Sequence, residues 1–265
     1  MARASSRFWL WWLPAAVALG ATLLFAGGFW LALRSATGRP LGALPPAPSG
    51  GARPASKKAG KLLLVLGDSL AHGTGDESGR GFAADVLDAM RRRGPVQIAN
   101  LAVNGAESPE IRDLVEKDNV RSLAASADWI LVSVGGNDLS HAAPRGDSPP
   151  AAPAGSLSRA RDRYASNLRA ILGRLRGSNP SAPIRVLGLY DPFEAGRESN
   201  RLGESVILGW NHLMQKTALG YSDVLVVPTF DLFEFRPDRL ALDHFHPNRA
   251  GYSLIATRIL QGLPD

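Results

Sequence analysis

From Lys61 to the C-terminus the sequence alternates short apolar runs with longer amphipathic segments. The apolar runs predict strands at 61–66, 96–100, 129–134, 184–189 and 223–228. Helical spacing predicts helices at about 82–93, within 108–126, and at about 157–176, 201–217 and 248–262. Strands separated by helices form parallel sheets, and strands that are apolar throughout are buried on both faces. The pattern therefore predicts an α/β fold in which helices cover both faces of a parallel sheet.

The N-terminal 60 residues have a different composition. Residues 8–33 form a stretch of 26 residues without a charged side chain, and about 20 apolar residues suffice to cross a bilayer. Trp9, Trp11, Trp12 and Trp30 lie near its ends, as in the aromatic belts of membrane helices. We expect residues 1–34 to be an uncleaved signal anchor. The alternative is a cleaved signal peptide, although its apolar region would be long and no small-x-small cleavage site follows.

Residues 35–60 are mostly Pro, Ala, Gly and Ser. Such a segment buries too little apolar surface to fold, so it is predicted to be a linker before a catalytic domain at 61–265.

The basic character of the chain comes from this N-terminal region. Residues 1–60 contain seven Lys or Arg residues and no acidic residue, whereas residues 61–265 contain 23 basic and 24 acidic residues. This distribution favours a membrane surface over nucleic acid as partner, and no basic stripe with interleaved aromatic residues follows. The absence of cysteine excludes thiol catalysis, cysteine-based zinc sites and disulfides.

Four segments that follow predicted strands, the last of them after a short detour, contain small polar or titratable residues. They are Gly67-Asp68-Ser69, the loop ending in Asn104-Gly105, Gly135-Gly136-Asn137-Asp138, and Asp243-His244-Phe245-His246-Pro247. In open parallel sheets, ligands bind beyond the carboxyl ends of the strands. We therefore expect the functional site at this edge.

Each of these residues has a structural alternative. Ser69 caps a helix or lies over backbone N–H groups that favour a developing oxyanion. Gly105 is a turn glycine or lets its N–H approach a ligand closely. Asn137 bonds its own turn or donates its amide to an oxyanion.

Asp243 precedes His246 by three residues. An Asp at that distance can orient the imidazole through one ring nitrogen and leave the other to accept a serine proton. The alternative is a metal site built from Asp243, His244 and His246, but the sequence offers it no clear further ligand. The dinucleotide and P-loop glycine motifs and the G-x-S-x-G elbow are absent.

With these four segments, the chain from Lys61 onward resembles the SGNH, or GDSL-type, esterase/lipase superfamily, and most closely its bacterial membrane-anchored or secreted branch. The resemblance implies a flavodoxin-like three-layer α/β/α sandwich with five parallel strands in the order 2-1-3-4-5. It implies Ser69 as nucleophile, His246 as general base and Asp243 as the residue that orients His246. It also implies an oxyanion hole formed by the backbone N–H groups of Ser69 and Gly105 with the Asn137 side chain, whereas Asp68 supports the loop. No metal or cofactor is implied.

The expected function is that of a serine esterase or lipase acting on carboxylic esters through an acyl-serine. Two alternatives stay open: an O-acetyl esterase acting on a cell-envelope polysaccharide, and a tethered binding module without catalytic activity. The branch that the chain resembles places the domain outside the cytoplasmic membrane. A single-pass membrane protein with an extracytoplasmic domain is therefore expected, with secretion after signal cleavage as the alternative.

Overall fold

The computed structural model describes residues 20, 22, 60–142, 155–192 and 198–264. The chain divides into two units, Met1–Pro54 and Ala55–Asp265, and the fold described below belongs to the second. The predicted apolar span over residues 8–33 lies outside the described residues except for Gly20 and Thr22. Within the described ranges, no helix has both the length and the apolarity needed to cross a membrane.

Five parallel strands form one sheet in the order β2-β1-β3-β4-β5. The strands are β1 (Lys61–Gly67), β2 (Val96–Asn100), β3 (Trp129–Ser133), β4 (Ile184–Leu187) and β5 (Val224–Val227). The last pair of β1 and β3 is Gly67 with Ser133. This order is the one that the resemblance implied, and it brings the carboxyl ends of β1 and β3 side by side.

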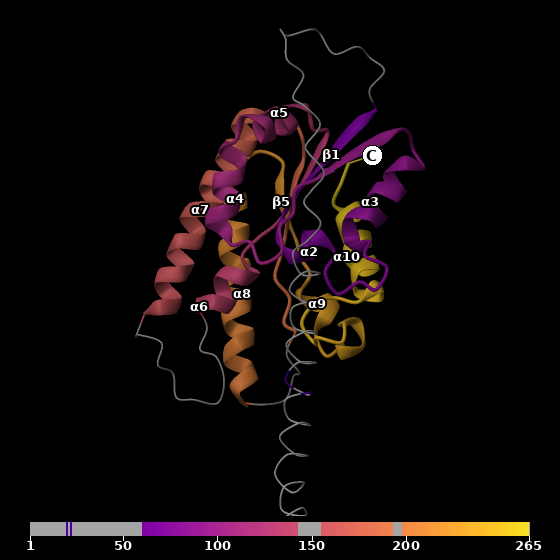
Figure 1. Ribbon diagram of the computed structural model, residues 1–265. Helices are drawn as coiled ribbons and strands as arrows, with labels where there is room; N and C mark the ends of the chain where they lie inside the picture. The colour runs from indigo at the N-terminus through magenta and orange to yellow at the C-terminus, as the bar shows by residue number, and fades with distance from the viewer. Residues whose placement is uncertain (1–19, 21, 23–59, 143–154, 193–197, 265) are drawn as a thin grey trace, which may run out of the picture. The chain divides into compact units, whose positions relative to one another are not determined.

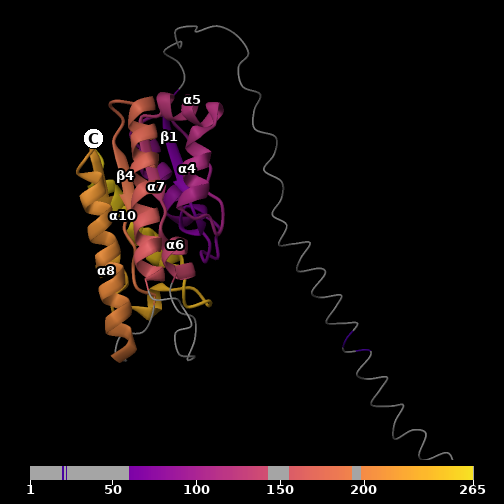
Figure 2. The ribbon, with the colours of Figure 1, turned by 90° about the vertical axis from the view of Figure 1, so that its left-hand side faces the viewer.

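Helices cover both faces of the sheet, which completes the three-layer arrangement (Figure 1). One face carries α4 (Ser108–Glu116), α5 (Asp118–Ser126), α7 (Ser156–Ser178) and α8 (Glu198–Ala218), which Figure 2 shows from outside. The other face carries α3 (Gly81–Arg91) and α10 (Arg249–Gln261). Short helices follow the strands: α2 (Ser69–His72), α6 (Gly136–Ala142), α9 (Phe230–Phe233) and the 3-10 helix η1 (Pro237–Arg239).

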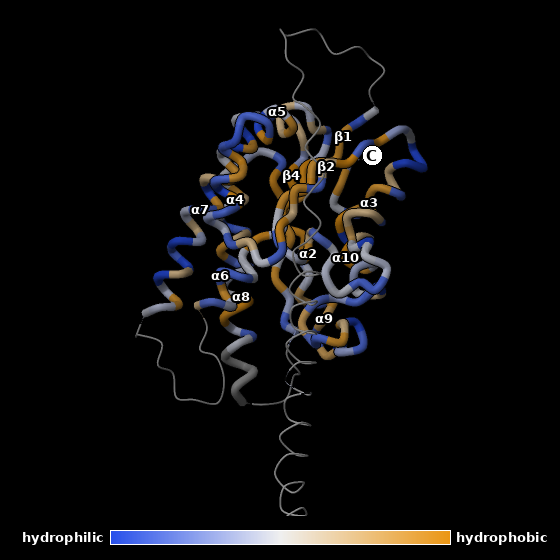
Figure 3. Tube along the Cα trace, viewed as in Figure 1, coloured by the Kyte–Doolittle hydropathy of each residue, from blue (hydrophilic) through white to orange (hydrophobic). Residues whose placement is uncertain are grey.

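The strands are buried on both sides, and alternate residues pack against the two layers of helices. In β1, Leu64 and Leu66 pack toward α4, α5, α7 and α8, whereas Leu63 and Val65 pack toward α3 and α10. Figure 3 shows the strands as hydrophobic and the outer sides of the helices as largely hydrophilic. Since apolar burial is the main stabilising contribution to a fold, this two-sided core holds the carboxyl edge of the sheet in place.

Several boundaries differ from the sequence-based expectations. The helical region within 108–126 is two helices, because Lys117 has an extended backbone (ψ 135°) between α4 and α5. The strand expected at 184–189 ends at Leu187, because the Asn211 amide binds both backbone groups of Leu189 in place of a neighbouring strand. Asn137, for which a turn was one of two alternatives, lies in the first turn of α6.

Candidate active site

The segment after β1 places Ser69 at the start of α2. Gly67 has a φ of +146°, and a Cβ there would lie 2.3 Å from the Ser133 carbonyl oxygen, so only glycine fits. Asp68 is the N-cap residue of α2, and its carboxylate accepts hydrogen bonds from the Leu70 N–H (3.0 Å) and the Ser133 hydroxyl (2.7 Å). The cap and the β3 contact together fix the backbone on both sides of Ser69.

Asp68 is a buried carboxyl group beside this serine. Burial raises its pKa to about 6, although the hydrogen bonds from Ser133 and Leu70 act in the opposite direction. Its side chain is bound to the interior of the fold and holds the loop, as the resemblance implied for it.

Ser69, His246 and Asp243 form a continuous chain of hydrogen bonds. The Ser69 Oγ lies 2.9 Å from Nε2 of His246, although the two residues are 177 positions apart. Nδ1 of the same ring lies 2.6 Å from Oδ2 of Asp243. The other Asp243 oxygen accepts the backbone N–H groups of Phe245 (3.0 Å) and His246 (2.9 Å). The structure thus brings together the three residues that the sequence analysis selected.

The Asp243 carboxylate is stabilised as an anion. Its partial burial raises the pKa, but hydrogen bonds from the His246 ring and from the backbone N–H groups of His246 and Phe245 outweigh that effect and lower the pKa overall. An ionised carboxylate on Nδ1 requires the N–H at that nitrogen, which leaves Nε2 of a neutral ring as the acceptor toward Ser69.

The loop that carries His246 is held from several directions. Its backbone pairs with the chain before it through the Leu240–Pro247 bridge and the bond from Ala241 N–H to the His246 carbonyl (2.8 Å). The Tyr190 hydroxyl donates to the Phe245 carbonyl (2.7 Å), and the Phe245 ring lies edge-on to the imidazole, 5.0 Å away. The imidazole is therefore placed by its surroundings as well as by Asp243.

Gly75, which lies between α2 and α3, contacts the same loop. Its φ is +94°, and a Cβ there would lie 2.6 Å from Cβ of His246 and 2.7 Å from the Pro247 carbonyl oxygen. The close approach explains a glycine that the sequence analysis did not select.

The two remaining residues of the expected site lie on neighbouring segments. Gly105 has a φ of +78°, so it needs the conformational freedom of glycine, and a Cβ there would contact nothing within 4 Å. The Asn137 amide donates to the carbonyl of Ala106 (2.9 Å), the residue after Gly105. The Gly105 loop is tied to the serine segment by bonds from Val103 N–H to the Gly67 carbonyl and from the Thr74 hydroxyl to Asn104 (both 2.8 Å).

A buried polar network behind Asn137 escaped the sequence analysis. Asp138 accepts from the backbone N–H (2.9 Å) and the hydroxyl of Ser108, and the Asn167 amide donates to that hydroxyl (3.0 Å). Burial raises the pKa of Asp138, while the Ser108 bonds oppose the shift. Asp138 stands in the GGND segment and was visible there, but no local pattern marks Asn167, which comes from α7.

The metal interpretation of the Asp243 segment gains no support from the geometry. Among the described residues, no group of three His, Asp or Glu side chains is arranged to hold an ion. His246 uses both ring nitrogens in the chain described above. His141 is bonded to Glu107 (2.5 Å), and His72 is exposed in α2.

A hydroxyl, an imidazole and a carboxylate in this order form the arrangement used for acyl transfer by serine hydrolases. The imidazole is placed to accept the hydroxyl proton, and the carboxylate is placed to stabilise the imidazolium that forms.

Comparisons with known proteins identify a relative in sequence and several in fold. Over 208 residues the chain is 28% identical to YpmR of Bacillus subtilis strain 168, an uncharacterized protein, with 76% of this chain and 81% of YpmR covered. The fold is similar to that of a lipase from a goat rumen metagenome (TM-score 0.66, 22% identity, 77% of this chain and 97% of the lipase chain). It is also similar to that of Axe2, an acetylxylan esterase from Geobacillus stearothermophilus (TM-score 0.59, 20% identity, 77% and 94%).

Residues 65–254 match the model of the GDSL-like lipase/acylhydrolase family. The chain therefore belongs to the GDSL-like lipase/acylhydrolase family and is an ester-hydrolysing enzyme.

Proposed function

We propose that this enzyme cleaves carboxylic esters through an acyl intermediate on Ser69. The observation that carries the proposal is the unbroken chain of hydrogen bonds from Ser69 through His246 to Asp243. Two solved variants of Axe2 are each described as a catalytic mutant of that enzyme, one with a serine and one with a histidine replaced. The same two residue types face each other here.

In the first half of the proposed reaction, the Ser69 Oγ attacks the ester carbonyl carbon while Nε2 of His246 accepts the hydroxyl proton. The tetrahedral intermediate places its negative oxygen near the backbone N–H groups of Ser69 and Gly105 and the Asn137 amide. It collapses as the C–O bond to the leaving alcohol breaks, and the His246 proton passes to that alcohol. Asp243 stabilises the imidazolium throughout.

In the second half, His246 removes a proton from water, and the resulting hydroxide attacks the acyl-Ser69 carbonyl. The second tetrahedral intermediate expels the Ser69 oxygen, which takes the proton back from His246. The carboxylic acid product releases its proton to solvent and leaves as the anion, and the enzyme returns to its starting state.

A fluorophosphonate probe and an ester panel test this assignment together. The wild-type enzyme should be labelled covalently and should hydrolyse at least one ester, whereas Ser69→Ala should do neither. Ser122→Ala, which changes an exposed serine of α5, is the matched control and should behave as wild type. Labelling that survives Ser69→Ala would place the nucleophile elsewhere, and an inactive wild type across the panel would contradict the proposal.

For the acyl and leaving groups we propose chemical classes. The panel should include simple carboxylic esters, thioesters and O-acetylated polysaccharides, because simple esters are the first candidate and acetylated envelope glycans are the second. The similarity to the fold of an acetylxylan esterase supports including acetylated glycans. A preference of at least tenfold in kcat/KM for acetylated glycan would favour the second candidate.

We further propose that residues 8–33 anchor the enzyme in the cytoplasmic membrane with the catalytic domain on the outer side. The uncharged length of this segment and the Trp residues near its ends support the proposal. In cells, the full chain should stay with membranes after alkaline extraction and should be cut by protease added outside. Release into the medium as a shortened chain would instead identify a cleaved signal peptide, and protection from external protease would contradict the orientation.

A further inference from the structure

Two successive residues of α6 hold the loop that carries Gly105. The Asn137 amide donates to the carbonyl of Ala106, 2.9 Å away. The Asp138 carboxylate accepts the backbone N–H of Ser108 (2.9 Å) and the hydroxyl of the same residue. The two proposed oxyanion donors that lie outside α2, the Gly105 N–H and the Asn137 amide, are therefore connected through their immediate neighbours.

This connection determines where the free N–H of the Asn137 amide points. A primary amide carries two N–H groups, and the Ala106 carbonyl accepts one of them. The position of that carbonyl therefore sets the direction of the second N–H. Because Ala106 follows Gly105 directly, a displacement of this loop would move both donors, and the contact that holds the loop against α6 sets their spacing.

The contact between Ser108 and Asp138 is the buried part of this connection. Ser108 is 0% exposed and Asp138 is 8% exposed. From α7, the Asn167 amide donates to the Ser108 hydroxyl (3.0 Å), and Arg112 donates in turn to the Asn167 carbonyl oxygen (3.0 Å). Each group donates to the next, and the chain ends on the Asp138 carboxylate. Hydrogen bonds in a network that excludes water fix the groups that they join.

Electrostatics alone does not explain a carboxylate next to Asn137. The tetrahedral intermediate carries a negative charge at the oxyanion hole, and a nearby anion opposes that charge. Burial raises the pKa of Asp138, although the hydrogen bonds from Ser108 act in the opposite direction. The carboxylate provides two acceptor oxygens, one for the N–H and one for the hydroxyl at the first residue of α4. Its structural contribution is therefore to hold the start of α4 against α6.

We propose that the contact between Asp138 and Ser108 positions the oxyanion hole by setting the spacing between the Gly105 N–H and the Asn137 amide. Both residues are buried behind the site and act through the loop and the amide, so they are positioning residues. The inference rests on the proposed function and extends it, because it names residues outside the triad and the oxyanion donors on which the rate of acyl transfer depends.

Ser108→Ala in the full-length enzyme removes the hydroxyl and tests this contact. On an ester that the wild type hydrolyses, kcat should fall at least about tenfold and KM should change less than about threefold, because oxyanion donors bind the transition state more strongly than the substrate. The rate at which a fluorophosphonate labels Ser69 should fall in parallel, since its phosphoryl oxygen takes the position of the oxyanion.

Asp138→Asn is the second variant, and it keeps the volume of the side chain and one acceptor oxygen for the Ser108 N–H. It loses the second acceptor and the charge, so we expect kcat to fall at least about fivefold with KM again nearly unchanged. Because this change is the smaller disturbance of the interior, it carries the test if Ser108→Ala does not fold.

A double-mutant cycle with Asn137→Ala separates positioning from general damage to the fold. If Ser108 acts through the Asn137 amide, the two losses of kcat should not multiply. The double variant should retain at least about fivefold more activity than the product of the single losses predicts, as expected for residues that act as a unit.

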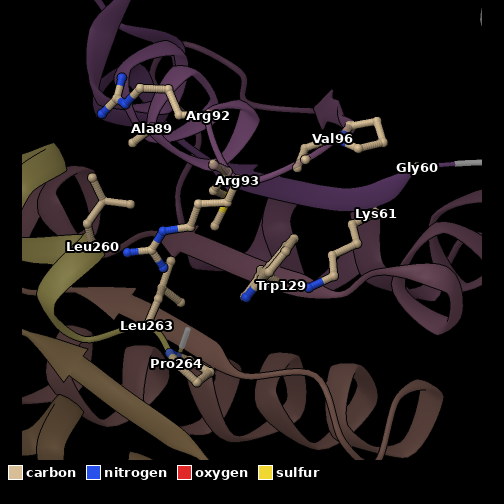
Figure 4. A pocket seen from close by; sticks show the side chains of 13 residues that line it. Gly60, Lys61, Ala89, Arg92, Arg93, Val96, Trp129, Leu260, Leu263 and Pro264 are labelled. Carbon is tan, nitrogen blue, oxygen red and sulfur yellow. The ribbon is translucent and has the colours of Figure 1, made fainter.

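The opposite edge of the sheet supplies the matched control. The seven residues of β1 separate this edge from the candidate active site by about 20 Å at the usual rise per residue. Figure 4 shows the cavity at this edge, which has a volume of about 580 Å³ and is lined in part by Trp129 and Leu263. Asn179 is buried at the same edge, where its amide donates to the carbonyls of Ala124 and Ala127 (both 2.8 Å). Asn179→Ala should lower stability but leave kcat and the labelling rate near wild type.

Three results would overturn the inference. The first is an active enzyme in which Ser108→Ala and Asp138→Asn both keep kcat within about twofold of wild type. The second is a pair of losses that multiply fully in the cycle with Asn137→Ala, which would mean that the contact supports the fold without setting the donor. The third is an increase of kcat in Asp138→Asn, which would show that the charge of this residue matters more than its position. A wild type that hydrolyses no ester and is not labelled would contradict the proposed function itself.

Discussion

Asp68 and Ser69 are neighbours in the sequence but have different surroundings. The Asp68 carboxyl is buried against Ser133 of β3, whereas the Ser69 hydroxyl meets His246. One residue holds the turn, and the next presents its oxygen at the carboxyl edge of the sheet. Because Asp68 is buried as a titratable group, its support for this turn carries a pH-dependent cost.

Replacing Asp68 by Asn should make the stability of residues 55–265 less dependent on pH. Burial raises the folded-state pKa of Asp68 from 3.8 to about 6, so the folded protein binds a proton in this interval that the unfolded chain has released. Stability therefore falls as pH rises from about 4 to about 6, by up to about 3 kcal/mol from this group. The asparagine side chain in Asp68→Asn does not titrate, so the variant should not lose this stability. The free energy of unfolding of the variant relative to wild type should therefore increase as pH rises across this interval.

Urea unfolding of both proteins at pH 4, 5, 6 and 7.5 measures this difference. A constant difference across the series would mean that Asp68 has the same pKa in the folded and unfolded states.

Asn137→Ala should lower kcat by about 10²–10³ if the amide donates to the oxyanion. The matched control is Asn100→Ala, because the Asn100 amide also donates to a backbone carbonyl at this edge, that of Ala71, at the same 2.9 Å as Asn137 to Ala106. Both variants lose a loop contact, but only Asn137 is proposed to contact the reacting oxygen. Equal losses of kcat in the two variants would show that Asn137 has a structural role and does not contact the reacting oxygen.

At the scale of elements, the close contact between two loops places the imidazole. The loop at 73–80 and the loop at 241–247 meet where Gly75 lies against His246 and Pro247. The Tyr252 hydroxyl of α10 also donates to the Thr74 carbonyl (2.6 Å), which ties the first loop to the helix that follows the second.

Gly75→Ala should therefore damage activity and stability together. A Cβ at this position would lie 2.6 Å from Cβ of His246 in a left-handed backbone conformation, so the histidine loop must shift. We expect kcat to fall at least about tenfold and the free energy of unfolding to fall by more than about 2 kcal/mol.

Gly79→Ala is the control, because Gly79 also has a positive φ (+66°) but its Cβ would meet nothing within 4 Å. It should cost about 1–2 kcal/mol of stability from backbone strain and leave kcat near wild type. Similar kcat values for the two alanine variants would show that the loop contact does not position His246.

The elements that the sequence predicted well are those with strong periodicity. The spacing of apolar residues predicts the five strands and the long helices. Asp243 and His246, which stand in one short segment, indicated the triad. The short helices α2, α6 and α9 follow strands and have no periodic pattern, so the sequence did not predict that Asn137 lies in a helix. Contacts such as Gly75 with His246 or Asn167 with Ser108 join distant segments, and no local pattern in one sequence encodes them.

At the scale of the whole molecule, the two edges of the sheet carry different features. The carboxyl edge carries the triad, and the opposite edge carries the cavity at Trp129 and the start of β1 at Lys61. Any chain that precedes Lys61 therefore joins the domain at the edge remote from Ser69. An anchor at residues 8–33 would thus be joined to the domain at the start of β1 and not at the carboxyl edge.

Arg185 ties this opposite edge together. Its side chain is only 3% exposed; Nε donates to the Gly262 carbonyl after α10 (2.5 Å), and a terminal nitrogen contacts the Asp223 carboxylate before β5 (2.9 Å). Arg185→Met keeps the volume but leaves these acceptors without a donor, and we expect it to cost about 2–4 kcal/mol of stability. The candidate active site lies at the other edge, so kcat should stay near wild type at temperatures where the variant is folded.

Arg174→Met is the comparison, because Arg174 pairs with Glu116 on the surface with 40% of its side chain exposed. Exposed ion pairs contribute about 1 kcal/mol or less, so its unfolding midpoint in urea should move much less than that of Arg185→Met. Equal shifts would mean that the buried arginine does not join the sheet to the C-terminal helix. A fall in kcat of the folded Arg185→Met protein would show instead that the two edges are coupled through the strands.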